Sequence, residues 1–182
     1  MNICVYCSAS NNIAEKYKQS AFRLGELIAE SGNTLVYGGA TGGLMDSVAE
    51  GSSSKNGNII GVIAKAIIRM NRQSALPSQL ITVETLSQRK DEMKSLADVF
   101  VALPGSYGTL DEALDVITSG IVGEHKKPLI LVNQDGFYNH FLDQINLMKT
   151  ELFIPIDEKY KPIVVEDITQ CFDNIIQFNN QK

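Results

Sequence analysis

Residues 98–117 decide the fold, and they read DVFVALPGSYGTLDEALDVI. The apolar run at residues 99–103 is too short for a helix and begins with β-favouring residues, which predicts a buried strand. Pro104-Gly105 marks a turn. Apolar residues then recur with helical spacing at Leu110, Ala113, Leu114 and Ile117. The stretch therefore predicts a strand, a glycine-containing turn and a helix in succession.

The turn before this helix has the features of an anion-binding loop. The first N–H groups of a helix have no internal partners and attract negative charge. Gly105 and Gly108 would let a phosphate approach the backbone without a Cβ in the way. An alternative remains, because Thr109 and Glu112 also have the spacing of a capping box, in which the glutamate only closes back on the helix start.

A second glycine-rich loop, GGATGG at residues 38–43, lies between an expected strand at residues 34–37 and an expected helix from residue 44. Such a loop can present backbone N–H groups to a phosphate, which makes Gly39 and Gly42 binding candidates. Its spacing is neither the dinucleotide G-x-G-x-x-G nor a P-loop. Alternatively, the glycines only allow the helix to pack closely on the sheet.

The helix expected at residues 85–97 has a cation on its apolar face. Arg89 lies three residues after Leu86 and four before Met93, so the three share one face. A charge there should be paired or should line a cleft, and Lys90 flanks the same face. The alternative is an arginine that extends along the surface to a carboxylate partner.

The chain begins with an expected strand at residues 2–8, a polar turn and a helix that ends near Glu30. A turn at the carboxyl end of a strand is where α/β sheets bind ligands, which makes Ser8 a binding candidate. Alternatively, Ser10 or Asn11 simply caps the helix.

Strands alternate with helices along the rest of the chain. Further strands are expected at residues 58–64, 79–83, 128–132 and 163–165, and helices from residue 135 or 136 and over residues 168–178. Residues 65–78 show no clear pattern and could form a mobile loop beside the site. The alternation predicts an α/β, Rossmann-like, doubly wound and mostly parallel sheet with helices on both faces. No repeat or linker interrupts it, so one domain over residues 1–182 is expected.

The composition is that of an ordinary soluble protein of 182 residues, with 44% hydrophobic and 20% charged residues. The net charge of −5 argues against a nucleic-acid partner but not against a small phosphate ligand. No membrane span or signal peptide is evident, so no membrane partner and a cytoplasmic location are expected. Cys4 and Cys7 should point to opposite faces of a strand, and no second Cys/His pair completes a zinc site.

Two motifs resemble those of the Lonely guy (LOG) family of nucleoside 5′-monophosphate phosphoribohydrolases. Residues 104–112, PGSYGTLDE, resemble the family's PGG-x-G-T-x-x-E, with Ser106 at the second glycine position. Residues 86–90, LSQRK, resemble M-x-x-R-K, with Leu86 in place of methionine. Serine at position 106 would be strained if the loop needed a positive φ there.

Two weaker motifs precede them in the family's order. Residues 38–46 resemble the family's G-G-G-x-x-G-L-M-G, with Ala40 and Asp46 at two glycine positions. Residues 8–10, Ser-Ala-Ser, stand where the family has Gly-Ser-Ser. The resemblance extends over nearly the whole chain as far as about residue 150.

The resemblance implies a hydrolase that cleaves the N-glycosidic bond of a nucleoside 5′-monophosphate, a cytokinin nucleotide or AMP, to free base and ribose 5-phosphate. It implies that Arg89 and Glu112 are catalytic. It implies that the nucleotide is bound by Ser8, Gly39, Gly42, Lys90, Pro104, Gly105, Ser106, Tyr107, Gly108 and Thr109. It further implies a homodimer and no metal or organic cofactor.

Two other functions remain open at this point. A non-catalytic nucleotide or molybdenum-cofactor carrier has a similar fold and similar glycine loops, but it leaves Arg89 and Glu112 without a role. Lysine decarboxylase is a label often given to this family. Its chemistry needs a pyridoxal phosphate Schiff base on a lysine, for which the sequence offers no motif.

Overall fold

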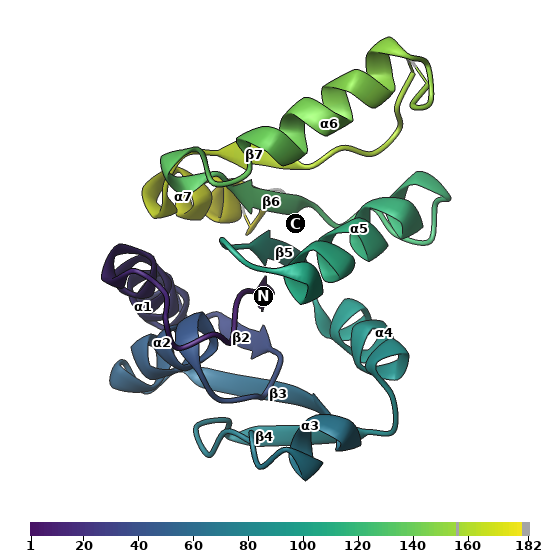
Figure 1. The fold of residues 1–182 in the computed structure, drawn as a ribbon. Helices are drawn as coiled ribbons and strands as arrows, with labels where there is room; N and C mark the ends of the chain where they lie inside the picture. The colour runs from purple at the N-terminus through teal and green to yellow at the C-terminus, as the bar shows by residue number, and fades with distance from the viewer. Residues whose placement is uncertain (156, 180–182) are drawn as a thin grey trace.

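One parallel sheet forms the centre of the computed structural model, which describes residues 1–155 and 157–179 (Figure 1). Its strand order is β4-β3-β2-β1-β5-β6-β7, and every neighbouring pair is parallel. The strands are β1 (Asn2–Tyr6), β2 (Thr34–Tyr37), β3 (Asn58–Ala64), β4 (Gln79–Val83), β5 (Val99–Ala102), β6 (Leu129–Val132) and β7 (Ile163–Val165). The expectation of a doubly wound α/β sheet is confirmed.

Helices cover both faces of this sheet, as Figure 1 shows. They are α1 (Glu15–Glu30), α2 (Gly43–Ser54), α3 (Lys65–Arg69), α4 (Leu86–Leu96), α5 (Tyr107–Ile121), α6 (Asn139–Thr150) and α7 (Ile168–Asn179). Helices α1, α2 and α7 pack on one face, whereas α4 and α5 pack on the other, where α6 also lies. The short helix α3 follows β3 at the edge of the sheet.

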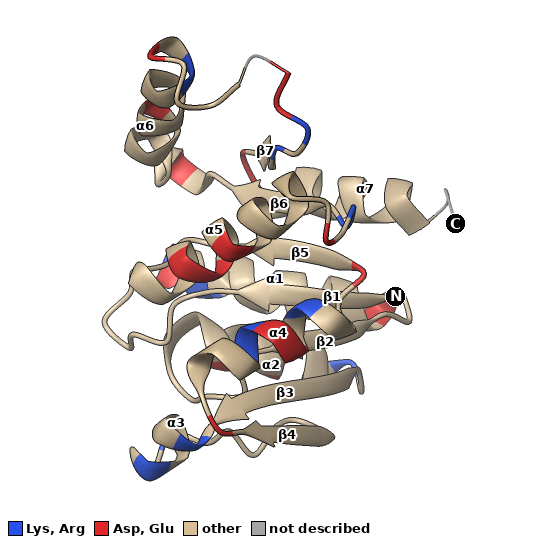
Figure 2. Ribbon diagram, turned by 90° about the vertical axis from the view of Figure 1, so that its right-hand side faces the viewer, with Lys and Arg blue, Asp and Glu red and all other residues tan. Residues whose placement is uncertain are grey.

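The strands are mainly apolar and carry no charged residue, because the sheet is covered on both sides. Along β1, Ile3 and Val5 join the core beneath α1 and α2, whereas Cys4 and Tyr6 join the core beneath α4 and α5. This alternation follows from the two-residue period of a strand. Figure 2 accordingly shows the strands almost free of charged residues.

The direction of winding reverses between β1 and β5, and this reversal positions the site. The chain first builds outward from β1 to β4, then returns to β5 on the other side of β1 and builds outward to β7. Val5 is paired with Tyr37 and Tyr6 with Ala102, so the loops after β1, β2 and β5 leave the sheet at one edge. Such a switch point is where open α/β sheets bind ligands.

Residues 65–78, which have no clear pattern in the sequence, form α3 and then a segment bound to the glycine-rich loop. Thr41 N donates to Arg72 O (2.7 Å) and Ser74 N donates to Gly39 O (2.9 Å), beside a short antiparallel bridge between Ala40 and Gln73. These backbone bonds make the segment a wall beside the loop rather than a free surface loop.

Three element boundaries differ from expectation by more than one residue. Strand β1 ends at Tyr6 rather than at residue 8, which leaves Cys7 and Ser8 in the following loop. The helix expected from residue 135 begins only at Asn139, after a 3-10 turn (Gln134–Gly136) in which Asp135 has a left-handed φ of 54°. Phe137 therefore precedes α6 instead of lying within it. Helix α5, by contrast, begins three residues earlier than expected.

Candidate active site

A buried ion pair joins the two helices that bear the expected catalytic residues. Arg89 Nη1 on α4 lies 2.6 Å from Glu112 Oε1 on α5, and the two residues are only 8% and 5% exposed. Arg89 Nε also donates to Val62 O on β3 (2.9 Å), so the guanidinium is held from two sides. The pairing explains how a cation can lie on the apolar face of α4.

The start of α4 and the loop after β2 fix the position of Arg89. Thr85 caps the helix, because its Oγ1 accepts a hydrogen bond from Gln88 N (3.2 Å). Gly38, the first residue after β2, packs directly against the guanidinium, and a Cβ at this position would collide with Arg89 Nη2. The close approach of the backbone to Arg89 therefore requires glycine at this position.

Burial sets the protonation behaviour of Glu112. Loss of hydration raises the pKa of this carboxyl above its ordinary value, and the neighbouring Arg89 guanidinium opposes that shift. The carboxyl group thus combines low exposure, a fixed orientation and a cationic partner. These properties suit a group that stabilises positive charge or orients a water molecule.

The N-terminus of α5 is open to an anion. The helix begins at Tyr107 with Ser106 as its N-cap residue, whose side chain makes no capping bond, and the first turn carries no acidic residue. Counting from the start of the helix, Leu110 is the first residue whose N–H makes a backbone hydrogen bond, and it donates to Ser106 O (3.0 Å). The preceding N–H groups are therefore the donors that a phosphate can accept from.

The capping-box alternative for this helix is wrong. Thr109 lies inside the first turn rather than at the N-cap, and the Glu112 side chain reaches Arg89 instead of the helix start. Ser106 has a φ of −102°, so serine is unstrained at the position where the family motif has glycine.

The N-terminus of α2, in the glycine-rich loop, is closed by the protein's own oxygen atoms. Gly42 N donates to Asp46 Oδ2 (2.7 Å) and Gly43 N donates to Asn11 Oδ1 (3.0 Å). Leu44 N and Met45 N both donate to the carbonyl oxygen of Ser8 (2.9 and 3.3 Å). Asn11 therefore serves α2, and α1 begins after Ala14 without a side-chain cap.

A cavity of about 240 Å³ lies at the switch point between these loops. Six of the expected site residues line it: Ser8, Arg89, Ser106, Gly108, Thr109 and Glu112. Its wall is largely apolar where Met45, Ile67 and Leu86 contribute. An open helix N-terminus, a buried carboxylate and an apolar wall therefore share one cavity.

The other six expected binding residues are absent from its lining: Gly39, Gly42, Lys90, Pro104, Gly105 and Tyr107. Gly39 packs behind the loop against Leu80, and Gly42 has a φ of 109° that the turn into α2 requires. Gly105 packs against the side chain of Thr109, where a Cβ would collide, while Pro104 is buried and Tyr107 is 91% exposed.

Lys90 belongs to a network of charges between α4 and α5 rather than to the cavity. Its Nζ lies 3.0 Å from Asp111 Oδ1 and 3.6 Å from Asp115 Oδ1. Lys94 Nζ lies 2.7 Å from Asp115 Oδ2. The two groups form an ion pair, but their angles are not those of a hydrogen bond. The network links the helices that bear Arg89 and Glu112.

Eight residues of the cavity lining were not among the expected site residues, and two of them, Gly38 and Arg72, bear on the chemistry. Gly38 directly follows the expected strand at residues 34–37, so its place at the strand end was a usable signal. Arg72 lies in the segment without periodicity, where no pattern indicates which way a side chain points.

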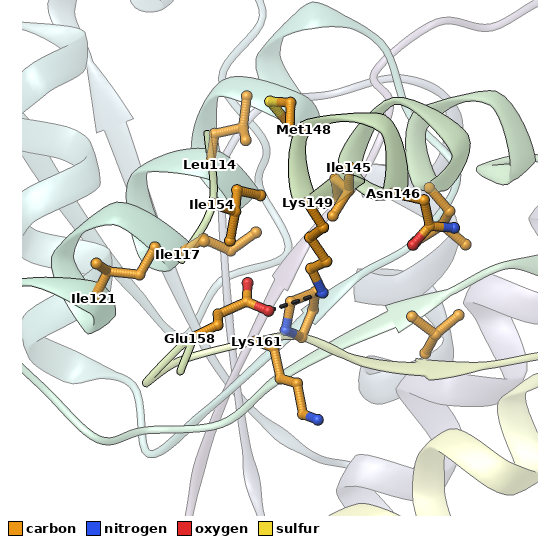
Figure 3. A pocket seen from close by; sticks show the side chains of 13 residues that line it. Leu114, Ile117, Ile121, Ile145, Asn146, Met148, Lys149, Ile154, Glu158 and Lys161 are labelled. Atoms are coloured by element: carbon orange, nitrogen blue, oxygen red, sulfur yellow. Dashed lines mark ion pairs between the residues drawn. The ribbon is translucent and has the colours of Figure 1, made fainter. Parts of the chain in front are cut away.

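A larger cavity, of about 310 Å³, lies between α5, α6 and the segment before β7 (Figure 3). Its lining is mainly aliphatic, including Leu114, Ile117, Ile145 and Ile154. The ion pair between Lys149 and Glu158 (2.8 Å) borders it. Neither Arg89 nor Glu112 lines this cavity, so we do not assign the chemistry to it.

Comparison with known proteins defines the family. A family model described as "Possible lysine decarboxylase" matches residues 45–175. The cytokinin riboside 5′-monophosphate phosphoribohydrolase LOG of Oryza sativa subsp. japonica is 41% identical over 157 residues, which are 86% of this chain and 65% of that protein. LOG7 of Arabidopsis thaliana is 40% identical over 152 residues, 84% of this chain and 70% of that one. The chain belongs to the LOG family.

Solved structures share the fold. The molybdenum cofactor binding protein of the phototrophic bacterium Rippkaea orientalis superposes with a TM-score of 0.74, over 98% of this chain and 96% of that one. The molybdenum cofactor carrier protein of Chlamydomonas reinhardtii superposes with a TM-score of 0.72. Both are 22% identical to this chain, so the likeness concerns the fold alone.

The residues of the cavity do not fit pyridoxal phosphate, which the family description would suggest. That cofactor requires a lysine for its Schiff base, and no lysine lines the cavity in the part of the chain that is described. Cys4 and Cys7 are both buried, in the cores on opposite faces of the sheet. The described residues hold no group of three or more potential metal ligands.

Proposed function

We propose that this protein hydrolyses the N-glycosidic bond of a nucleoside 5′-monophosphate to a free base and ribose 5-phosphate. The observation that carries the proposal is the buried pair of Arg89 and Glu112 beside the open N-terminus of α5. The names of the rice and Arabidopsis relatives give the reaction class. The chain spans 65% of the rice protein's length, so the activity of the whole relative is proposed here rather than transferred.

The proposed binding mode follows the polarity of the cavity. The 5′-phosphate accepts hydrogen bonds from the first turn of α5, where Ser106, Gly108 and Thr109 line the cavity. The ribose then lies beside Glu112, and the base lies against the apolar wall that includes Met45 and Leu86. Ser8 borders the same space from the loop after β1.

In the proposed mechanism, the bond between C1′ and the base nitrogen breaks as the ribose gains oxocarbenium character. The Glu112 carboxylate stabilises that positive charge and orients a water molecule, whose oxygen forms the new bond to C1′. The water proton leaves through the carboxylate, and the departing base takes up one proton. Arg89 stays charged, so it acts by holding Glu112 and by hydrogen bonding rather than by giving up a proton.

Incubation of the purified protein with AMP and with isopentenyladenosine monophosphate tests this proposal. Chromatography should detect free base and ribose 5-phosphate in equal amounts from at least one of them. Nucleotide binding without base release would reject the hydrolase and favour a carrier function. The ratio of the two rates gives the base preference. We expect the prenylated adenine to be preferred, because the wall of the cavity is largely apolar.

We further propose that the working form is a homodimer that associates through the α5–α6 side. Several large apolar side chains are exposed in α5, in α6 and just beyond each helix: Leu114, Ile121, Val122, Leu147, Leu152 and Phe153. Light scattering of the purified protein should give twice the chain mass, and Val122→Lys should lower it. A single-chain mass for the wild type would reject this assembly.

We propose that the chain works as one domain in the cytoplasm. The seven strands share one sheet, and the cysteines are free thiols, which suits a reducing compartment. Within the described residues, none of the helices is long and apolar enough to cross a membrane.

A further inference from the structure

The cavity that holds Arg89 and Glu112 is lined by one further charged residue, Arg72. It lies in the segment between α3 and β4, and it is partly buried. The motifs of the sequence do not include it.

Hydrogen bonds hold Arg72 at the junction of two loops. Its Nη2 donates to the carbonyl oxygen atoms of Ala9 (2.7 Å) and Thr41 (2.8 Å), in the loops after β1 and β2. Its own carbonyl oxygen accepts a hydrogen bond from Thr41 N (2.7 Å). The backbone of Arg72 is therefore anchored, and its guanidinium stays at the edge of the sheet where the cavity opens.

The charge of Arg72 is not neutralised by an ion pair within the described part of the chain. Arg89 is paired with Glu112, and the nearby Asp46 uses an oxygen atom to accept from Gly42 N. Both side-chain hydrogen bonds of Arg72 come from Nη2. The N–H groups of Nε and Nη1 therefore have no acceptor among the described residues and can bind a ligand. The charged side chains lining the cavity therefore leave one positive charge uncompensated.

We propose that Arg72 binds the phosphate of the nucleotide substrate, an inference that rests on the hydrolase proposed above. The first turn of α5 supplies uncharged N–H donors, whereas Arg72 supplies a full charge with donors arranged in a planar fork. Both border a cavity of about 240 Å³, small enough for one sugar phosphate to meet both. Arg72 is then a binding residue that distinguishes nucleotides from nucleosides.

Calorimetric titration of ribose 5-phosphate and of adenosine into the wild type, Arg72→Met and Arg69→Met tests this role. Ribose 5-phosphate has no bond to a base and therefore cannot turn over, whereas adenosine keeps that bond but lacks the 5′-phosphate of the proposed substrate. Arg69 is a matched control, because it is exposed on α3 and absent from the cavity lining. Arg72→Met should weaken ribose 5-phosphate binding about tenfold or more and leave adenosine binding unchanged. Arg69→Met should change neither.

Equal weakening of both ligands would overturn the inference, because it would show that Arg72 only holds the loops together. Unchanged ribose 5-phosphate binding in Arg72→Met, or no binding by the wild type, would also overturn it. Arg72→Lys, which keeps the charge, should recover part of the lost affinity. The hydrolase proposal is tested separately by base release. A wild type that binds ribose 5-phosphate but releases no base would reject the hydrolase and leave the titration results for Arg72 unchanged.

Discussion

Arg89 and Glu112, from two consecutive helices on one face of the sheet, are joined by a 2.6 Å contact between Nη1 and Oε1. The contact is almost fully buried, and Val62 O holds the guanidinium from the sheet side. A charge pair at the switch point of a parallel sheet needs this much support, because taking two charges out of water is costly unless their hydrogen bonds are satisfied. Its position beside an open helix N-terminus is what makes it a candidate catalytic pair.

Glu112→Gln should lower the turnover number by about 10²–10⁴-fold, because the amide cannot stabilise a cationic ribose or accept a proton from water. The amide oxygen can still accept from Arg89, so the fold should persist. Steady-state base release and circular dichroism check the two halves of this expectation. Turnover within a few-fold of the wild type, with an intact spectrum, would exclude Glu112 as the catalytic carboxylate.

The rate of base release should fall on the acid side with an apparent pKa above the ordinary glutamate value of 4.5, because burial raises the pKa of Glu112. The reaction needs the ionised form, so activity rises as pH rises through this folded-state pKa. The acidic limb of kcat/KM measures it. A limb at or below 4.5 would contradict the assigned role.

The same shift predicts how stability depends on pH. The folded protein binds the Glu112 proton more tightly than the unfolded chain does, so this residue contributes stability below 4.5 that is lost as pH rises through the raised folded-state pKa. The unfolding free energy of the wild type relative to Glu112→Gln should therefore decrease over that window. Denaturant titrations at several pH values give this difference. A relative stability that increases with pH there would mean that the folded-state pKa is lowered.

Gly38→Ala should reduce turnover strongly, because the added Cβ would displace the Arg89 guanidinium. Gly108→Ala is the matched control for the free protein, since a Cβ there meets no atom within 4 Å. Because Gly108 lines the cavity, that change should raise KM rather than lower kcat. The KM and kcat values of the two variants test this contrast. Equal kcat losses in both would mean that Gly38 has no special relation to Arg89.

Asp115→Asn should lower the unfolding free energy by less than about 1 kcal/mol, because Asp115 and its two lysine partners are only partly buried and water still screens their attraction. It should also lower kcat a few-fold, because the charges between α4 and α5 hold together the helices that bear the proposed catalytic pair. Thermal unfolding and steady-state kinetics measure the two effects. Lys18→Met, which removes an exposed ion pair on α1, is the control and should leave kcat unchanged.

The apolar runs of the sequence predicted the strands well, because a sheet covered on both faces needs uninterrupted apolar segments. Strands β2, β3 and β4 have the expected limits. The start of α5 was harder to place, since Ser106 caps it without a side-chain bond and the apolar spacing begins only at Leu110. A helix start that depends on open backbone donors leaves little trace in apolar periodicity.

The candidate site was only partly predictable. Arg89 and Glu112 could be named separately, but their contact depends on how α4 and α5 pack on the sheet. Gly39 and Gly42 were expected to bind the substrate, yet the N-terminus of α2 is occupied by Ser8, Asn11 and Asp46. Local glycine patterns describe what a loop can do, whereas the neighbouring loop determines which of its donors remain free.

We propose that the pair of Arg89 and Glu112 carries out the cleavage of a nucleotide's glycosidic bond. The most direct test compares base release from AMP and isopentenyladenosine monophosphate by the wild type and by Glu112→Gln at equal enzyme concentration. We expect free base from the wild type and a loss of about 10²–10⁴-fold in the variant. No base from either nucleotide with the wild type, or equal release by both proteins, would contradict it.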